Sequence, residues 1–170
     1  DARFEETEQD IATHKAESAS DDVHGLSKKI VARRIGLQQS IENDTFTTII
    51  YSYTVTSHTE LITYNNGDFT IVDPNIKYVR VNAGISWTPN VNGYRLLLAS
   101  KNNSTYSSIS GGINSQQGSS GSWDNKDAFQ NISCLFDVVA GDTLQVRVRQ
   151  NSGGALLTSN RGFVALEVYY

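Results

Sequence analysis

The sequence predicts a mainly β protein, an antiparallel sandwich that follows an N-terminal arm. Short runs rich in Val, Ile, Thr and Tyr recur along the chain, and Asn-, Gly- and Ser-rich turns separate them. The chain holds 13 Gly but only 2 Pro and no Met. β-branched and aromatic residues favour strands, and turns at short intervals are typical of sandwiches. Because the chain has 170 residues, it is long enough for one domain with a substantial core.

Charge and composition exclude some classes of protein. The 14 Lys and Arg residues are outnumbered by 18 Asp and Glu, which gives a net charge of −4. An overall negative charge does not attract polyanions, so we expect no nucleic acid partner. No apolar run reaches the roughly 18 residues that a membrane crossing needs, so we expect no membrane partner. The single cysteine, Cys134, lies in an apolar run and is predicted to be a small core residue.

Residues 1–43 are predicted to form a helical arm of two short helices that contacts partner chains. The first part, residues 1–22, has eight acids, two bases and no Gly or Pro, which favours a helix. Its apolar stripe is thin, since Phe4 and Ile11 are followed by Ser18 in the heptad series. So polar a helix is not stable alone, and it needs copies of itself or a surface on which to lie.

The second helix of the arm is expected to begin after Asp22. Apolar residues then recur at helical spacing at Val23, Leu26, Ile30 and Val31. This part of the arm is basic, with Lys28, Lys29, Arg33 and Arg34. The acidic first part and the basic second part are therefore able to pair, within one chain or between chains.

Residues 44–170 are predicted to form a jelly-roll domain. Within 78–87, small and apolar residues alternate with polar ones, which places one side of that strand in the core. Asn66-Gly67 favours a tight hairpin turn, and the Ser- and Gly-rich stretch 101–126 predicts a long surface loop with room for a short strand near Trp123. The expected strands, whose number suits a jelly roll, are 46–55, 61–64, 69–72, 78–87, 94–99, 132–139, 143–150 and 163–169.

Four motifs then follow one another in order. They are the turn and strand Asn66-Gly67-Asp68-Phe69, the strand Leu96–Asn103, the turn Ala140-Gly141-Asp142 before Leu144-Gln145-Val146, and the closing Ser159–Tyr170 with Phe163 and Leu166. Together they resemble the C1q/TNF-like trimeric jelly roll, which implies a homotrimer. The chain departs from the family in its tail, where an aromatic usually stands shortly before Gly-Phe and this chain has Ser159-Asn160-Arg161.

The arm narrows this resemblance. Thr13-His14-Lys15-Ala16 and Asp22-Val23-His24-Gly25-Leu26 resemble linker segments of phage tail and tailspike proteins. An arm of this kind, followed by a C1q-like jelly roll and beginning at Asp1, is similar to the C-terminal domain of podophage neck appendage (tailspike) proteins. The resemblance implies an intramolecular chaperone that trimerises together with the β-helical spike portion upstream of it in the same precursor. It further implies self-cleavage before Asp1 and release in an ATP-dependent step. The domain would act in the bacterial host cytoplasm during virion assembly and be absent from the mature virion.

Self-cleavage before Asp1 would use a Ser directly upstream as nucleophile and the carboxylates of Asp1, Glu5 and Glu6 as catalytic helpers. The chain would then be at most an autoproteolytic product and not an enzyme that turns over. The alternative for Glu5 and Glu6 is that acids at a helix N-terminus favour the helix dipole. His14 and His24 are alternative bases, although His14 fits a packing position better.

ATP binding has no conventional signature here, because a Walker loop is absent. The basic residues Lys28, Lys29, Arg33 and Arg34 are the candidate phosphate ligands, and Arg147 and Arg149 come next. The alternative is that the four form a solvated surface or pair with the acidic part of the arm.

No metal site is predicted, since Asp68, Asp73 and Asp142 stand in turns. Four tyrosines are candidates for strand pairing, for a trimer seam or for stacking on carbohydrate: Tyr51, Tyr53, Tyr78 and Tyr94. Two functions therefore remain as alternatives to the chaperone. One is a receptor- or carbohydrate-binding tip of a tail fibre, and the other is an extracellular recognition module.

Overall fold

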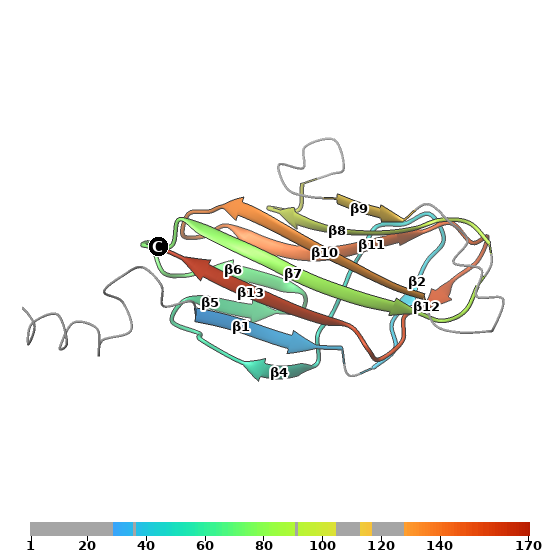
Figure 1. Cartoon of the computed structure of the whole chain (residues 1–170), viewed down its shortest axis with the longest axis horizontal. Coiled ribbons are helices and arrows are strands. Elements are labelled where there is room, and N and C mark those ends of the chain that lie inside the picture. The colour runs from blue at the N-terminus through green and yellow to red at the C-terminus, as the bar shows by residue number, and fades with distance from the viewer. Residues whose placement is uncertain (1–28, 36, 91, 105–112, 117–127) are drawn as a thin grey trace, which may run out of the picture.

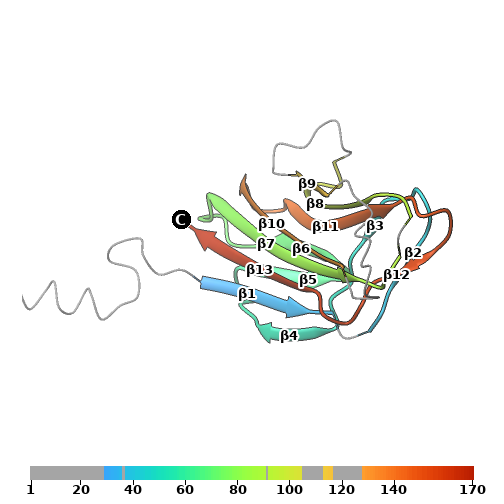
Figure 2. The ribbon, with the colours of Figure 1, turned by 45° about the vertical axis from the view of Figure 1, so that its right-hand side comes forward.

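Two antiparallel β-sheets packed on each other form the domain (Figures 1 and 2). The computed structural model describes residues 29–35, 37–90, 92–104, 113–116 and 128–170. The strands are β1 (Lys29–Arg34), β2 (Ser40–Ile41), β3 (Thr47–Thr48), β4 (Tyr53–Thr56), β5 (Ile62–Asn65), β6 (Asp68–Ile71), β7 (Tyr78–Trp87), β8 (Arg95–Lys101), β9 (Ile113–Gln116), β10 (Ala128–Asp137), β11 (Thr143–Gln150), β12 (Leu156–Leu157) and β13 (Phe163–Tyr169).

The sheets interleave distant parts of the chain. One sheet has the order β10-β7-β13-β1-β4, and the other has the order β5-β6-β11-β8-β9, with β3 beside β11. A short ladder joins β2 to β12. The described part of the chain contains strands and no helix, and the prediction of a jelly-roll fold is confirmed.

The prediction of a second helix is wrong for residues 29–34. These residues form β1, which pairs with β13 on one side and β4 on the other. The spacing of Ile30 and Val31 from earlier apolar residues fits a helix, but both are β-branched, and pairing on two sides outweighs local helical periodicity. β1 and β2 belong to the sandwich, so it begins before residue 44. The first predicted helix, in residues 1–22, lies outside the described residues.

The core lies between the sheets, and strands that alternate, such as β11 and β13, contribute every second residue to it. In β7, Val79, Val81, Ala83, Ile85 and Trp87 are all buried, as the pattern predicts. The strands β7, β11 and β13 match their predicted ranges at both ends. Cys134 is 4% exposed, which confirms its core position.

The predicted strand 46–55 is divided in two. β3 pairs with β11 of one sheet, whereas β4 pairs with β1 of the other. Between them the chain crosses from sheet to sheet and buries Ile49 and Tyr51. A run made almost wholly of β-branched and aromatic residues cannot reveal such a crossing, because both segments look like one strand.

The hairpin predicted at Asn66-Gly67 is present. These two residues connect β5 to β6, with Asn65 paired to Asp68. Both have positive φ, 48° and 99° respectively, which suits the tight turns that match strand twist. A Cβ on Gly67 would also lie 2.6 Å from a methyl group of Thr48, so glycine is needed there for two reasons.

Within the long segment 101–126, the structure places β9 at Ile113–Gln116, next to β8. The strand expected near Trp123 lies outside the described residues. Within the described ranges, no helix has the length and apolarity that a membrane crossing requires.

Candidate functional site

The predicted site residues are only partly described. Asp1, Glu5, Glu6 and Lys28 lie outside the described residues, as do His14 and His24. The other three basic candidates, Lys29, Arg33 and Arg34, stand on β1. Neighbouring strand residues point to opposite sides of a sheet, so Arg33 and Arg34 do not share a surface. The structure therefore divides the basic cluster that the sequence suggests.

Arg33 lies on the inner side of β1 and packs at the edge of the core. Its guanidinium carbon is 3.9 Å from the centre of the Tyr64 ring. Its Nε and Nη2 atoms each lie 3.4 Å from the backbone oxygen of Tyr51 and donate to it. Burial, and secondarily the neighbouring Tyr64, raises the pKa of the Tyr51 phenol well above its usual range. Arg33 thus packs on the Tyr64 ring and donates to the Tyr51 backbone, so its guanidinium group is already engaged.

Arg34 lies on the other side of β1, which belongs to a surface that we call the outer face. The outer face is the side of the sheet β10-β7-β13-β1-β4 that is turned away from the second sheet. Its large exposed apolar and aromatic residues are 36–63% exposed. They are Ile30, Tyr53, Tyr78, Phe129, Leu135 and Phe163.

A hydrogen-bonded network occupies the middle of the outer face. Asn82 Nδ2 donates to Glu167 Oε1 at 3.0 Å, and Ser133 Oγ donates to Asn82 Oδ1 at 2.7 Å. The Tyr169 hydroxyl donates to Glu167 Oε2 at 2.9 Å, and Arg80 Nη1 lies 3.9 Å from the same oxygen. Glu167 is therefore held by groups from both β7 and β13, and its side chain is only 13% exposed.

An aromatic pair lies at one end of the outer face. The rings of Phe129 and Phe163 stack with their centres 6.5 Å apart, on either side of Gly84. A Cβ on Gly84 would lie 2.5 Å from the Phe163 ring and 2.8 Å from the Phe129 ring. The missing side chain thus lets both rings lie over the backbone of β7.

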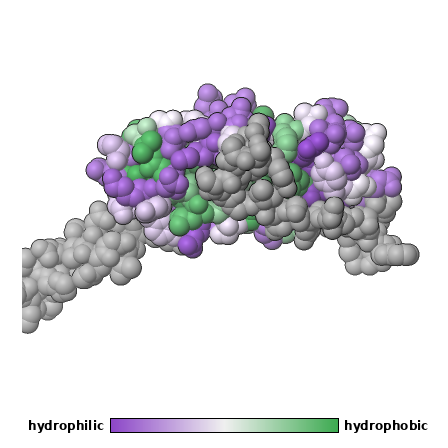
Figure 3. All heavy atoms as spheres, turned by 90° about the horizontal axis from the view of Figure 1, so that it is seen from above, coloured by the Kyte–Doolittle hydropathy of each residue, from purple (hydrophilic) through white to green (hydrophobic). Residues whose placement is uncertain are grey.

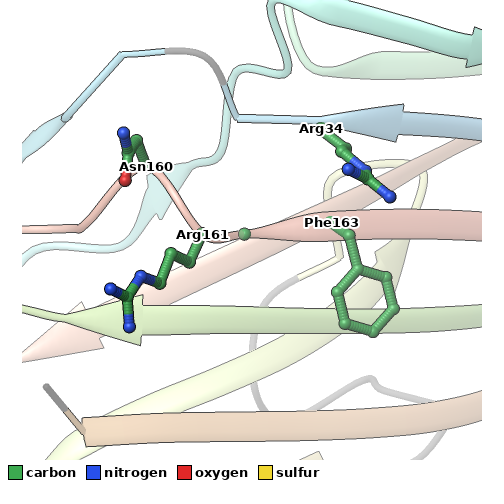
Figure 4. Close-up of a pocket in the computed structure, with 5 residues that line it drawn as sticks. Arg34, Asn160, Arg161 and Phe163 are labelled. Atoms are coloured by element: carbon green, nitrogen blue, oxygen red, sulfur yellow. The ribbon is translucent and has the colours of Figure 1, made fainter.

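A pocket of about 390 Å³ opens beside Phe163. Arg34, from the end of β1, and Asn160, Arg161 and Gly162, from the turn before β13, complete its lining. In Figure 4 the side chains of Arg34 and Phe163 project alongside each other, and Arg161 extends across β7. The register explains this placement, because Arg34 is paired with Phe163 on one side and Tyr53 on the other.

The pocket has the guanidinium group of Arg34 beside its aromatic wall, and that of Arg161 points the opposite way from the other side of Gly162 (Figure 4). Such a set suits an anionic group, which guanidinium binds through paired N–H donors, next to an apolar or flat one. Sequence reasoning named Arg34 but missed Asn160, Arg161 and Phe163 as site residues. The signal was present in the tail, where Asn160-Arg161 replaces the aromatic of the C1q/TNF-like pattern.

The second pair of basic candidates, Arg147 and Arg149, lies on β11 and is engaged locally. Arg149 donates through Nε and Nη2 to Asp44 Oδ1, at 3.0 and 2.6 Å. Both guanidinium groups pack near the Phe46 ring, at 5.3 and 5.1 Å from its centre. Because Arg149 already has a carboxylate partner, this pair is a weaker phosphate site than the pocket.

The four tyrosines do not share one platform. Tyr51 is buried, Tyr53 and Tyr78 are 63% and 48% exposed on β4 and β7, and Tyr94 donates to Asp44 at 3.2 Å next to β8. Within the described ranges, no three His, Cys, Asp or Glu side chains are close enough to hold a metal ion.

Seen from above relative to Figure 1, the surface of the molecule is mainly polar. Hydrophilic residues cover most of what Figure 3 shows in colour, and hydrophobic residues appear between them in small separate patches.

No protein-family profile and no curated protein matches the sequence. Solved structures match in fold. Murine APRIL at pH 5.0 is 9% identical with a TM-score of 0.57, covering 83% of this chain and 98% of that one. PRD1 vertex protein P5 is 16% identical with a TM-score of 0.55, covering 84% and 72%. Eiger TNF from S. frugiperda is 14% identical with a TM-score of 0.53, covering 84% and 92%. These likenesses show the TNF-like jelly-roll fold.

Proposed function

We propose that the chain is a homotrimeric assembly chaperone for a phage tailspike or neck appendage, and that it is released after self-cleavage before Asp1. The observation that supports it best is the outer face, whose exposed aromatic and aliphatic side chains surround a polar network that is already satisfied. A surface of this make-up resembles the core of a protein interface, in which aromatic residues are enriched. In a trimer with three-fold symmetry it would contact a different surface of the next copy.

The physical role of such a trimer is to bring three upstream chains together. A triple-chain β-helix has high contact order, so its strands pair only after a large loss of chain entropy. A domain that folds and trimerises by itself raises the effective concentration of the three attached segments, to the millimolar range for short linkers. This role belongs to the bacterial host cytoplasm during assembly, and the released domain is then absent from the virion.

Self-cleavage is proposed to use a Ser upstream of Asp1, with Asp1, Glu5 and Glu6 as carboxylate helpers. The test is expression of a longer precursor followed by intact-mass analysis. We expect a spontaneous cut directly before Asp1 that is lost when the preceding residue is replaced by Ala. A native trimer made only of uncut precursor would overturn the proposal.

Release is proposed to depend on ATP, with the triphosphate bound by basic residues. Of the four that the sequence suggests, Arg34 is favoured because it shares a pocket with Arg161. In a trimer of cleaved precursor, ATP should speed release of the domain, and Arg34→Gln with Arg161→Gln should reduce this acceleration at least tenfold. Arg147→Gln is the matched control. Equal acceleration by ATP in all three proteins would contradict this assignment.

A receptor- or carbohydrate-binding tip is the second candidate. Tyr53 favours it, since this tyrosine is 63% exposed and is paired with Arg34 of the pocket. Mass spectrometry of purified virions separates the two functions. Peptides from residues 29–170 in mature particles would support the tip, and their absence would support the released chaperone.

A further inference from the structure

The positive charges of the two pocket arginines have no negatively charged partner in the described part of the chain. Neither the Arg34 nor the Arg161 guanidinium group has a hydrogen bond or an ion pair there. The two acidic side chains of the outer face lie elsewhere, Glu167 in its network and Asp137 near Lys101. The end of the outer face with the pocket is therefore positive and aromatic, and its nearest acids already have partners.

The chain itself contains a segment of matching chemistry. Residues 1–22 hold eight acids and two bases, and Phe4 stands directly before the acidic pair Glu5-Glu6. An aromatic ring next to two carboxylates complements a pocket in which the Arg34 guanidinium group lies beside the Phe163 ring and the Arg161 guanidinium group lies on the other side of Gly162 (Figure 4). Carboxylate and guanidinium form paired, charge-assisted hydrogen bonds, and aromatic rings add favourable stacked contacts.

We propose that residues 1–22 of a neighbouring copy dock in the pocket formed by Arg34, Arg161 and Phe163. The direction of β1 favours a neighbouring copy over the chain's own arm. Residue 28 joins β1 at Lys29, and the pocket is at the other end of the strand, at Arg34. An arm that turned back across the outer face would lie where the proposed trimer contact is.

The docked arm links each copy to the next through charge, in addition to the apolar contacts of the outer face. Such a link is sensitive to salt and to competing polyanions, because charged groups at a surface are screened within about 10 Å at 0.1 M salt. The inference rests on the trimer of the proposed function. It does not depend on self-cleavage or on ATP.

The test converts charge contact into a covalent bond. Arg34→Lys and Arg161→Lys keep the positive charge and supply an amine, which a carbodiimide joins to a carboxylate in contact with it. The full chain is used as an equal mixture of ¹⁵N-labelled and unlabelled copies at a concentration at which sedimentation shows a trimer. Mass spectrometry then gives the linked carboxylate and tells links within one chain from links between chains.

We expect links from Lys at position 34 or 161 to acids of residues 1–22, in mixed-isotope pairs. Thr63→Lys, exposed on β5 of the other sheet, is the control and should give at least tenfold fewer links to this segment. Three outcomes would each overturn the proposal. They are links only to acids of residues 29–170, links only within single chains, and a yield of links to residues 1–22 no higher than in the Thr63→Lys control. If sedimentation shows only a monomer, the trimer of the proposed function is wrong. This outcome differs from a trimer without links to residues 1–22, which would overturn only the docking of the arm.

A second measurement, limited proteolysis, needs no added lysine. A Glu-specific protease should cut wild-type residues 1–22 at least fivefold more slowly than it cuts them in Arg34→Gln/Arg161→Gln. Inorganic tripolyphosphate should speed cutting of the wild type and leave the double variant unchanged. Equal rates in both proteins without tripolyphosphate contradict arm docking. Tripolyphosphate that binds without changing the rate would identify the pocket as a small-anion site and also contradict it.

Discussion

At the scale of single residues, Gly84 determines how the aromatic end of the outer face is built. The two phenylalanine rings occupy the space that a side chain at this position would fill. Their contact therefore depends on a missing methyl group and not on a polar or charged partner. No pattern within β7 marks this glycine, because its effect comes from Phe129 and Phe163 on the strands at either side.

Gly84→Ala should separate the rings. The new Cβ would lie 2.5 Å from Phe163 and 2.6 Å from Asn131 Oδ1, so these side chains must swing outward. We expect a loss of about 1 kcal/mol, the low end for overpacking because the rings are partly exposed. That corresponds to a fall in Tm of about 2–4 °C. Gly154→Ala is the control, since its Cβ would meet nothing within 4 Å, and an equal fall in both would contradict the explanation.

Asp142 is a second residue whose surroundings have a measurable effect. Its carboxylate accepts hydrogen bonds from the backbone N–H of Val139 at 3.0 Å and from Asn102 Nδ2 at 2.8 Å, and Lys101 Nζ is 3.6 Å away. Burial by itself raises the pKa of this carboxyl, but these three donors outweigh it and hold the pKa below its usual value. The charged form is therefore favoured by folding.

The sign of the pH effect follows from the lowered pKa of Asp142. Its stabilisation is complete above the unfolded pKa of about 3.9 and is lost as the pH falls through the lower folded pKa. Asp142→Asn should lower the free energy of unfolding by about 1–2 kcal/mol at pH 7, and the difference should shrink below pH 4. Urea unfolding at several pH values measures this.

Asp137→Asn is the matched control, because Asp137 also lies near Lys101, at 3.8 Å, but is 77% exposed. Exposed ion pairs contribute little, so we expect a change within about 0.5 kcal/mol. A difference between wild type and Asp142→Asn that stays constant down to pH 2 would contradict the role of the carboxylate charge.

At the scale of elements, strands with strict alternation could be predicted from sequence, and β1 could not. β11 and β13 bury every second residue, as β7 does from Tyr78 to Ala83, so their patterns give both type and bounds. β1 has apolar and long side chains on both sides, and its burial depends on β13, over 120 residues later. The pocket could not be predicted from the sequence for the same reason, since Arg34 lies next to Phe163 only because β1 pairs with β13.

Val31→Asp tests whether β1 is part of the sandwich. Val31 is 3% exposed, so a carboxylate there would be buried without a partner. We expect a loss of at least about 3 kcal/mol, followed by unfolding in circular dichroism. Ile30→Asp, on the outer face and 36% exposed, should keep the fold. A folded and equally stable Val31→Asp would mean that residues 29–34 are not a core strand.

At the scale of the whole molecule, the two sides of the five-stranded sheet have different tasks. One side packs on the second sheet and forms the core. The other side combines exposed apolar residues with a polar network, a composition that suits a contact between copies. Composition and motifs could predict the sandwich, but only strand register shows which exposed residues lie together.

Leu135→Glu should dissociate the proposed trimer. Leu135 is 50% exposed on the outer face, beside Arg80 and in line with Glu167 across β7. A new carboxylate there is desolvated on association, so we expect a dissociation constant at least tenfold higher, about 1.4 kcal/mol. Sedimentation over a range of concentrations measures it.

Leu157→Glu is the control for this change, since Leu157 is 42% exposed on β12, outside the five-stranded sheet. It should leave the association unchanged. Equal weakening by both variants, or no weakening by Leu135→Glu, would contradict the assignment of the outer face.

The pairing of β1 with β13 also sets a time at which the domain is able to fold. Lys29 is matched with Val168, so β1 cannot complete its place in the sheet until β13 has left the ribosome. Synthesis proceeds from the N-terminus at about 5–20 residues per second, and everything upstream is made earlier. A domain with this register therefore closes its fold only after any preceding segment has been translated. If three copies associate only once folded, association waits until β13 has been made.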